Sequence, residues 1–190
     1  MVFLKSITLA SQSPRRRDIL TELGIPFHIV PSGYEENNGR LLAPEELVRL
    51  QAEGKARDVY TRTGGIVLGA DTVVVLDGKV LGKPKDAADA GRMLRSLSGR
   101  THHVLTGVAV ISPGHMQSGV VSTAVTFRRL SDAEIDDYIQ GGEPMDKAGA
   151  YAIQGRGRQF VAAIEGSFSN VVGLPKKLTI ELLEKAYGVG

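Results

Sequence analysis

The chain has 190 residues, of which 42% are hydrophobic and 23% charged, as in an ordinary globular protein. It contains no cysteine, which excludes disulfides and thiolate chemistry, and no apolar run approaches the roughly 20 residues of a membrane span. The formal net charge of +2 does not demand a nucleic-acid surface. This length suffices for one domain, or for two small lobes around a shared sheet.

The first predicted helix begins with a serine and arginines. Ser6–Ala10 has the pattern of a short strand, and Ser13 before a proline is typical of a helix start, so we expect a helix over Pro14–Leu23. Arg15 and Arg16 then lie in its first turn, beside backbone N–H groups that favour phosphate. A solvated basic helix start is the alternative. Arginines here oppose the helix dipole, so alanine at either position is expected to leave stability unchanged or slightly higher.

A polar loop and a long helix follow. Phe27–Pro31 is predicted to be a strand, and the loop after it contains Glu35 and Glu36, which are either solvated or metal ligands. A helix is predicted over Pro44–Thr63, with Lys55 on its apolar stripe. A lysine on an inward stripe either extends to solvent or reaches an anion.

Gly65–Leu76 is rich in β-branched and apolar residues, which predicts a strand buried on both faces. Asp71 lies near its middle, where an ionised carboxylate needs a cation, a metal or dense hydrogen bonding. The stretch is either a strand whose carboxylate opens into a site or a turn between two short strands. The first is favoured because Asp77-Gly78 is the better hairpin turn, leading into a strand over Lys79–Leu81. Lys83 follows, either as a phosphate ligand or as an exposed lysine.

The second half of the chain is predicted to alternate helices and strands. A capping box at Ser131–Glu134 starts one helix. The glycine-rich segment Gly142–Gly157 matches no regular element, which suits a binding loop, and within it Gln154 either presents its amide to a base edge or is structural. The other predicted elements are helix Asp86–Leu97, strand His103–Ile111, its partner Val120–Phe127, strand Gln159–Ile164, and a last helix that follows Gly166–Pro175 and ends near Tyr187.

These candidate groups together favour phosphate chemistry. The sequence has no Walker A loop, no complete dinucleotide fingerprint and no nucleophile elbow. It offers arginines at a helix N-terminus, two inward lysines, and the carboxylates of Asp71 and Glu36. Cations for phosphates, carboxylates for a hard divalent ion and a carboxylate to orient water are what hydrolysis of a phosphoanhydride requires.

Six motifs, in order along essentially the whole chain, resemble the Maf (septum-formation) family of nucleotide pyrophosphatases. They are Leu9–Arg16, Gly69–Thr72, Gly82–Pro84, Leu97–His102, Asp146–Gly155 and Asn170–Pro175. The resemblance implies a single α/β domain over residues 1–190, elongated and two-lobed, with a mixed β-sheet and a central cleft, similar to the inosine-triphosphate pyrophosphatases. It also implies hydrolysis of a nucleoside triphosphate to the monophosphate and pyrophosphate, with a divalent metal cation (Mg, Mn or Co).

The resemblance further assigns roles position by position. Asp71 matches the family's catalytic proton acceptor, and Glu36 and Asp71 match its metal side. Its phosphate-binding positions fall at Ser11, Arg15, Arg16, Lys55 and Lys83. Its positions for substrate choice fall at Arg15, Arg16, Thr72 and Gln154. Tyr34-Glu35-Glu36 stands where Val-Asp-Glu is common in the family, so a metal-binding part for Glu35 stays open.

The segment around Asp146–Gln154 resembles the branch of the family that acts on dTTP and UTP, with modified pyrimidine nucleotides as further substrates. The alternatives are the sister branch that acts on 7-methyl-GTP, a non-enzymatic cell-division regulator, and a nucleic-acid binder using Arg15–Arg17, which the low net charge disfavours. A nucleoside triphosphate is the expected partner, a homodimer is left open, and neither nucleic acid nor a membrane is expected. Met1–Lys5 lacks the layout of a signal peptide, so a cytoplasmic location is expected.

Overall fold

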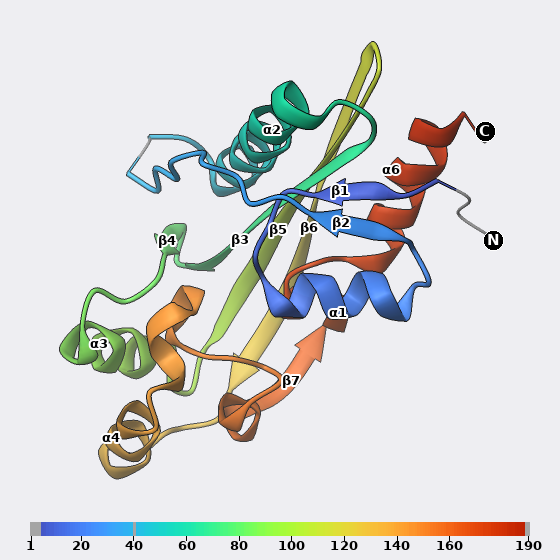
Figure 1. The fold of residues 1–190 in the computed structure, drawn as a ribbon. Helices are drawn as coiled ribbons and strands as arrows, with labels where there is room; N and C mark the ends of the chain where they lie inside the picture. Colours follow the sequence, from blue (N-terminus) through green and yellow to red (C-terminus); the bar gives the residue numbers. More distant parts are fainter. Residues whose placement is uncertain (1–4, 40, 189–190) are drawn as a thin grey trace.

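The computed structural model describes residues 5–39 and 41–188, in which helices and strands are interspersed along the chain (Figure 1). The expectation that the N-terminus lacks a signal-peptide layout concerns Met1–Lys5, of which Met1–Leu4 lie outside the described residues. The strands are β1 (Ile7–Leu9), β2 (Phe27–Ile29), β3 (Val67–Leu76), β4 (Lys79–Leu81), β5 (Thr101–Ser112), β6 (His115–Phe127) and β7 (Val161–Glu165). The α-helices are α1 (Pro14–Glu22), α2 (Pro44–Thr63), α3 (Ala87–Leu97), α4 (Asp132–Gln140), α5 (Phe168–Val172) and α6 (Lys176–Tyr187). Three short 3₁₀ helices are η1 (Glu143–Asp146), η2 (Ala148–Ala150) and η3 (Arg156–Phe160).

All seven strands belong to one mixed sheet, in the order β2-β1-β3-β5-β6-β7, with β4 also paired to β3. β1 runs parallel to β2 and β3, whereas the β3-β5-β6-β7 part is antiparallel. β5 and β6 form a long hairpin that extends past the other strands (Figure 1). On one edge of β3, β1 pairs only with Val67 and Leu68, and β4 pairs only from Val74 onward. Between these points that edge has no partner strand in the part of the chain that the structure describes.

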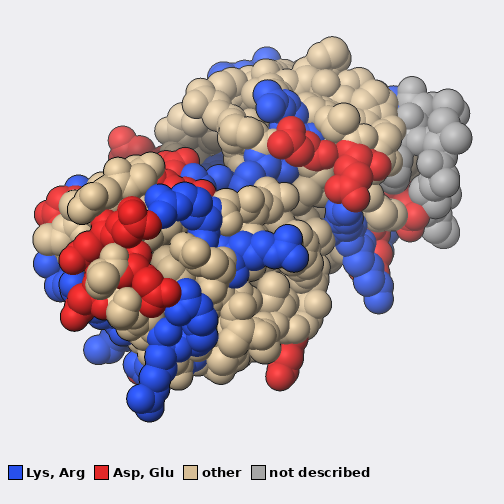
Figure 2. Space-filling model, turned by 90° about the horizontal axis from the view of Figure 1, so that it is seen from below, with Lys and Arg blue, Asp and Glu red and all other residues tan. Residues whose placement is uncertain are grey.

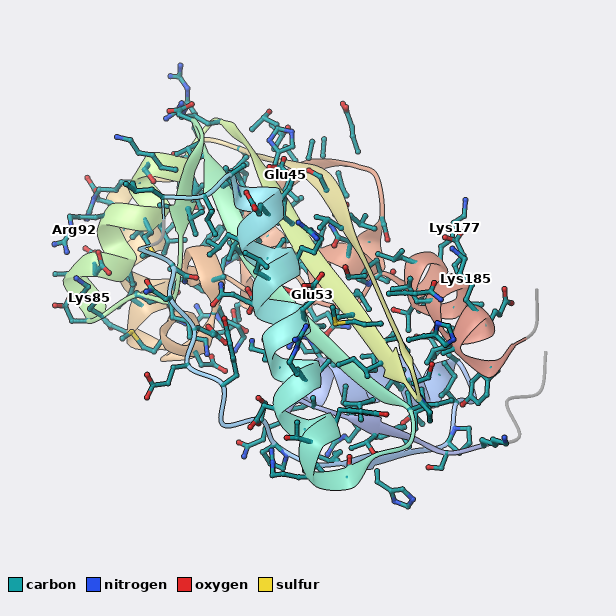
Figure 3. The ribbon with its side chains drawn as sticks, turned by 90° about the horizontal axis from the view of Figure 1, so that it is seen from above. Glu45, Glu53, Lys85, Arg92, Lys177 and Lys185 are labelled. Atoms are coloured by element: carbon teal, nitrogen blue, oxygen red, sulfur yellow. The ribbon has the colours of Figure 1, made fainter. Side chains whose placement is uncertain are left out.

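Helix α2, on which Glu45 and Glu53 are labelled, lies across one face of the sheet over β3 and β5 (Figure 3). Two glycines allow its backbone to approach the strands closely. A Cβ atom at Gly69 would lie 2.4 Å from the Ala52 carbonyl oxygen, and one at Gly107 would lie 2.3 Å from that of Val48. Inward side chains of α2 therefore reach the strands directly.

The opposite face of the sheet carries two hydrophobic clusters. One lies under α1 and α6 and includes Leu20 and Leu182, and the other lies under α3 and α4 and includes Leu94 and Ile135. Alternate residues of β3 and β5 contribute to both clusters, because these strands run through both halves of the sheet. The two clusters form the cores of two lobes on this face.

The predicted helices and strands are present, and three segments differ from the prediction. The segment Gly142–Gly157, for which no regular element is predicted, contains η1, η2 and the start of η3. The predicted strand over Gln159–Ile164 is wrong at its start, because η3 continues to Phe160 before β7 begins. The segment Gly166–Pro175 contains the short helix α5, which begins after Ser167, whose hydroxyl accepts a hydrogen bond from the Asn170 N–H at 3.2 Å. Among the described residues, no helix is long and apolar enough to cross a membrane.

Candidate active site

A cavity of about 590 Å³ lies where the edge of β3 is unpaired. Neighbouring residues of a strand point to opposite faces of a sheet. Accordingly, Asp71 bonds to side chains of α2 on one face, and Thr72 bonds to Arg16 and Thr106 on the other. Both nevertheless line the cavity, because the open edge gives access to both faces. The other walls come from the β1–α1 connection, from Lys83, and from the segments 146–148, 151–153 and 171–173.

The carboxylate of Asp71 is buried within β3, with 4% of the residue exposed. The Lys55 ammonium lies 2.7 Å from its Oδ1, and the Gln51 Nε2 donates to its Oδ2 at 3.1 Å. Both carboxylate oxygens are therefore bonded to groups from α2. The strand interpretation of this stretch is confirmed, and Lys55 is the cation that the buried carboxylate requires.

Glu36 lies on the solvent side of the same ammonium, with its Oε1 2.6 Å from Lys55 Nζ and 40% of its side chain exposed. Burial raises the pKa of Asp71, and the Lys55 charge offsets only part of that effect. For Glu36 burial also opposes ionisation, but the charge and hydrogen bond of Lys55, together with the charges of Lys83 and Arg16, outweigh it, so its pKa lies below the ordinary value. The site thus holds two carboxylates in different environments around one shared cation.

Gln51 joins this centre to the loop that carries Glu36. Its amide is buried, with 1% of the residue exposed, and three of its hydrogen bonds are made inside the protein. Besides Asp71, its Nε2 donates to the Asn38 Oδ1 at 2.9 Å, and its Oε1 accepts from the Asn37 N–H at 3.0 Å. Gln51 therefore holds both the catalytic candidate and the acidic loop in place.

At the other side of the cavity lies the N-terminus of α1. Ser13 caps the helix, accepting from the Arg16 N–H at 3.5 Å, and the Ser11 hydroxyl accepts from the Ser13 N–H at 3.2 Å. The Arg15 side chain lines the cavity and makes no hydrogen bond or ion pair with the residues that the structure describes. Ser11, Arg15 and Arg16 are thus together, as predicted, at a helix end that favours anions. Figure 2 shows one face of the molecule with Lys and Arg side chains across its middle, and Asp and Glu side chains to either side.

Arg16 is fixed in place by three hydrogen bonds. Its Nε donates to the Gly173 carbonyl at 2.9 Å, one terminal nitrogen to the Ser11 hydroxyl at 3.2 Å, and the other to the Thr72 hydroxyl at 3.1 Å. Burial lowers the pKa of Arg16 although Asp71 and Glu36 oppose this, and a guanidinium stays charged at neutral pH regardless. The expectation that Arg16 has no part in stability is therefore revised, because it ties α1 to β3 and to the end of α5.

The remaining predicted residues are divided between the cavity and the surface. Lys83 is exposed and lines the cavity. Gln154 is exposed and is not among the cavity-lining residues of the described chain, although it directly follows two that are, Ala152 and Ile153. Glu35 is also exposed and outside the lining.

Some residues in or next to the cavity wall were not identified from the sequence. Gln51 lies four residues before Lys55, so the two share one face of α2, which is the signal that could have indicated it. Asp146 and Lys147 form an ion pair in the cavity wall, and Tyr151 also lines the cavity. No pattern in the sequence indicated Thr106, which lies opposite Thr72 on the neighbouring strand β5. No group of three or more His, Cys, Asp or Glu side chains that could hold a metal occurs among the described residues.

Comparison with known proteins identifies the family. The family model described as "Maf-like protein" matches residues 6–186. The chain belongs to the Maf family. Two curated Maf relatives are named dTTP/UTP pyrophosphatase: the protein from Thermococcus gammatolerans, 51% identical, with 96% of this chain and 98% of the relative covered, and that from Moorella thermoacetica, 53% identical, covering 95% and 94%.

Solved structures place this Maf protein in a wider fold group. A HAM1 protein from Coxiella burnetii aligns over 100% of both chains with a TM-score of 0.52 and 17% identity. The Staphylococcus aureus Ham1 protein aligns over 97% of this chain and 98% of its own, with a TM-score of 0.51 and 12% identity. At these identities the likeness concerns the fold alone, and it confirms the predicted α/β fold with a mixed sheet.

Proposed function

We propose that this Maf protein hydrolyses dTTP and UTP to the nucleoside monophosphate and pyrophosphate. The observation that carries the proposal is one cavity that holds both the buried Asp71–Lys55 pair and the arginine-bearing N-terminus of α1. A carboxylate that can take a proton from water and a cationic anion-binding helix end are the two parts that hydrolysis of a phosphoanhydride requires. Relatives about half identical over nearly the whole chain carry that activity in their names.

In this proposal Asp71 takes the proton from a water that attacks the α-phosphorus. Its Oδ1 and Oδ2 are held by Lys55 and Gln51, so the carboxylate is oriented before substrate arrives. Arg15 and Arg16, with Lys83 across the cavity, bind the phosphates and stabilise the charge that develops on the pyrophosphate leaving group. Arg16 has two N–H groups left after its three internal bonds, since a guanidinium carries five.

A divalent cation fits this donor set. Mg²⁺ is commonly held by one or two carboxylates together with substrate phosphates, and Glu36 and Asp71 supply two carboxylates in the cavity wall, both within hydrogen-bond distance of one ammonium. These two residues would hold the ion. When bound, it neutralises charge on phosphate oxygens.

Substrate choice is assigned to Arg15, Arg16, Thr72 and Gln154. Gln154 is proposed to pair with the base, because its amide offers a donor and an acceptor to the adjacent carbonyl and N–H of uracil or thymine. It follows directly on the lining residues Ala152 and Ile153, which supports this placement. A site built for one base edge rejects another, because its own polar groups are then left unpaired.

The test is a panel of dTTP, UTP, ATP, GTP and 7-methyl-GTP with Mg²⁺, Mn²⁺ or Co²⁺, scored as kcat/KM with separate detection of pyrophosphate and phosphate. We expect pyrophosphate as the product and dTTP and UTP as the best substrates. Gln154→Ala should reduce that preference more than it slows turnover, whereas Gln159→Ala, also exposed and outside the cavity lining, should change neither. A best kcat/KM for 7-methyl-GTP would contradict the substrate assignment, and release of phosphate alone would contradict the reaction.

A further inference from the structure

A line of hydrogen bonds runs from the cavity wall into the core. It begins at Arg16, which donates to the Thr72 hydroxyl at 3.1 Å. The Thr72 and Thr106 hydroxyls lie 2.9 Å apart, and the Thr106 hydroxyl donates to the Asn170 carbonyl at 3.2 Å. Thr106 is fully buried, with 0% of the residue exposed. It does not line the cavity and so cannot act on a substrate directly.

The direction of every bond in this line follows from counting hydrogens. A hydroxyl has one hydrogen and can accept two bonds. The hydrogen of Thr106 is used on the Asn170 carbonyl, so in the contact between the two threonines Thr106 must accept and Thr72 must donate. The guanidinium of Arg16 can only donate, so Thr72 accepts there. The hydrogen of Thr72 is thereby used inside the protein, and one acceptor position is left.

We propose that Thr106 is a positioning residue that fixes the Thr72 hydroxyl as a hydrogen-bond acceptor for Arg16. This inference rests on the proposed function, in which Arg16 binds the triphosphate. Thr72 then affects substrate choice by holding Arg16, and by accepting one bond from a substrate N–H or O–H. It cannot donate to a base carbonyl, so recognition of the carbonyls of uracil or thymine falls to other groups.

The surroundings separate this role from one in stability alone. The Asn170 carbonyl also accepts from the Gly173 N–H at 3.0 Å, so it keeps a partner when Thr106 loses its hydroxyl. The Gly173 carbonyl in turn accepts from the Arg16 Nε at 2.9 Å. Arg16 is thus held at two points by the end of α5, once directly and once through the two threonines. Loss of the Thr106 hydroxyl should loosen only the contact made through the two threonines.

The experiment is a double-mutant cycle of Thr72→Val and Thr106→Val, measured both as kcat/KM for dTTP and as the dissociation constant of inorganic tripolyphosphate. Thr72→Val should lose about tenfold, the size of the hydrogen bond that Thr72 accepts from the charged Arg16. Thr106→Val should lose up to about the same factor, because the Thr72 hydroxyl is then no longer fixed as an acceptor. The double variant should be no worse than Thr72→Val, because Thr106 acts through Thr72. Thr106→Ser, which keeps the hydroxyl, should stay within about threefold of wild type. Thr106→Ala against Thr106→Ser gives the same comparison if valine is not accommodated.

The matched control is Thr179→Val, which removes another fully buried hydroxyl, one without a partner among the described residues. It should leave both measurements unchanged. Losses that multiply to about a hundredfold in the double variant, or an equal loss for Thr106→Ser, would overturn the inference. Failure of the proposed function is distinguishable, because it would appear as a wild-type protein that does not hydrolyse dTTP while the tripolyphosphate cycle still reports the coupling.

Discussion

At the scale of single residues, the site depends on a carboxylate in an unfavourable place. Burying an ionised group costs several kcal/mol unless partners compensate, and Asp71 has two, from Lys55 and Gln51. Burial still raises its pKa. At a pH above the ordinary pKa of aspartate, the charged carboxylate is therefore less favourable in the folded protein than in the unfolded chain. Stability alone gives no reason for a carboxylate here, so its placement is explained by what it does in the cavity.

Asp71→Asn is expected to fold with an unchanged or slightly higher melting temperature and to lose activity. Lys55 keeps its bond to Glu36 at 2.6 Å, so no charge is left buried alone. Loss of a general base typically lowers turnover by about 10²–10⁴-fold. The matched control is Asp136→Asn, an exposed carboxylate on α4, which should retain wild-type turnover. More than half of wild-type turnover in Asp71→Asn would remove Asp71 from the mechanism.

Arg15→Ala and Arg16→Ala should separate binding from stability. Arg15 makes no hydrogen bond or ion pair in the described structure, so its loss should weaken catalysis without lowering the melting temperature. Relief of the dipole repulsion should leave the free energy of unfolding unchanged or raise it by about a few tenths of a kcal/mol. Arg16 makes three hydrogen bonds, so its loss should also cost about 1–3 kcal/mol of unfolding free energy. Thermal and urea unfolding of both variants measures the difference. Equal melting temperatures would mean that the Arg16 contacts contribute nothing to stability.

At the scale of elements, the close contact of α2 with the sheet positions the site. Gly107 lies opposite Asp71 on the neighbouring strand, and its missing side chain leaves room for the α2 backbone at Val48. Gln51 and Lys55 lie on the next turns of the helix, where they reach the carboxylate. A shift of α2 by a few tenths of an ångström would thus alter both bonds to Asp71 together.

Gly107→Ala should therefore lower both stability and activity. The added Cβ meets helix backbone, which cannot rotate away, and overpacking of this kind costs about 1–3 kcal/mol. Gly119→Ala is the control, since there a Cβ at 2.9 Å would meet only the side chain of Leu178. Urea unfolding and dTTP turnover should show a clear loss in the first variant and a small one in the second. A fully active Gly107→Ala enzyme would show that the α2 contact does not set the geometry of Asp71.

Elements with strong local signals could be predicted from the sequence. The β-branched run around Asp71, the helix over Pro44–Thr63 and the capping box at Ser131 appear where expected. The segment from Gly142 to Phe160 could not be predicted, because its three 3₁₀ helices are held by contacts with other parts of the chain. The Gly149 N–H donates to the Gly82 carbonyl at 3.1 Å, and the Ala152 N–H donates to the Tyr138 hydroxyl at 3.2 Å.

The sequence indicated the site residues that are charged and lie in an apolar pattern. It did not indicate the neutral residues that hydrogen-bond to them. Asp71 and Lys55 were indicated because each is a charged residue in an apolar pattern. Gln51 and Thr106 are polar residues that local patterns place equally well at a surface, and their contacts depend on α2 and β5 meeting β3. Such contacts between distant segments are visible only in the folded molecule.

At the scale of the whole molecule, a buried histidine should make stability depend on pH. His102 is fully buried in the lobe under α3 and α4, and its Nε2 lies 2.8 Å from the Tyr151 hydroxyl. Burial, and to a lesser extent His103, lowers the pKa of His102 from 6.5 to about 4. Between these pH values the unfolded chain binds a proton that the folded protein excludes. Stability contributed by His102 is therefore complete above pH 6.5 and is lost as the pH falls towards 4.

His102→Gln should flatten this part of the pH dependence. The loss attributable to His102 amounts to up to about 3 kcal/mol between the two pKa values. Glutamine does not titrate, and its amide can still donate to Tyr151. Urea unfolding at several pH values from 4 to 7 should show a shallower slope in the variant than in wild type. Parallel curves would mean that His102 titrates normally in the folded protein.

The most direct test of the account is hydrolysis of dTTP by the wild-type protein in ¹⁸O-labelled water, with mass analysis of both products. If water activated at Asp71 attacks the α-phosphorus, the label must appear in dTMP, and the pyrophosphate must carry none. Label in the pyrophosphate, or release of labelled phosphate with dTDP, would show attack at another phosphorus and would contradict the reaction proposed for this cavity.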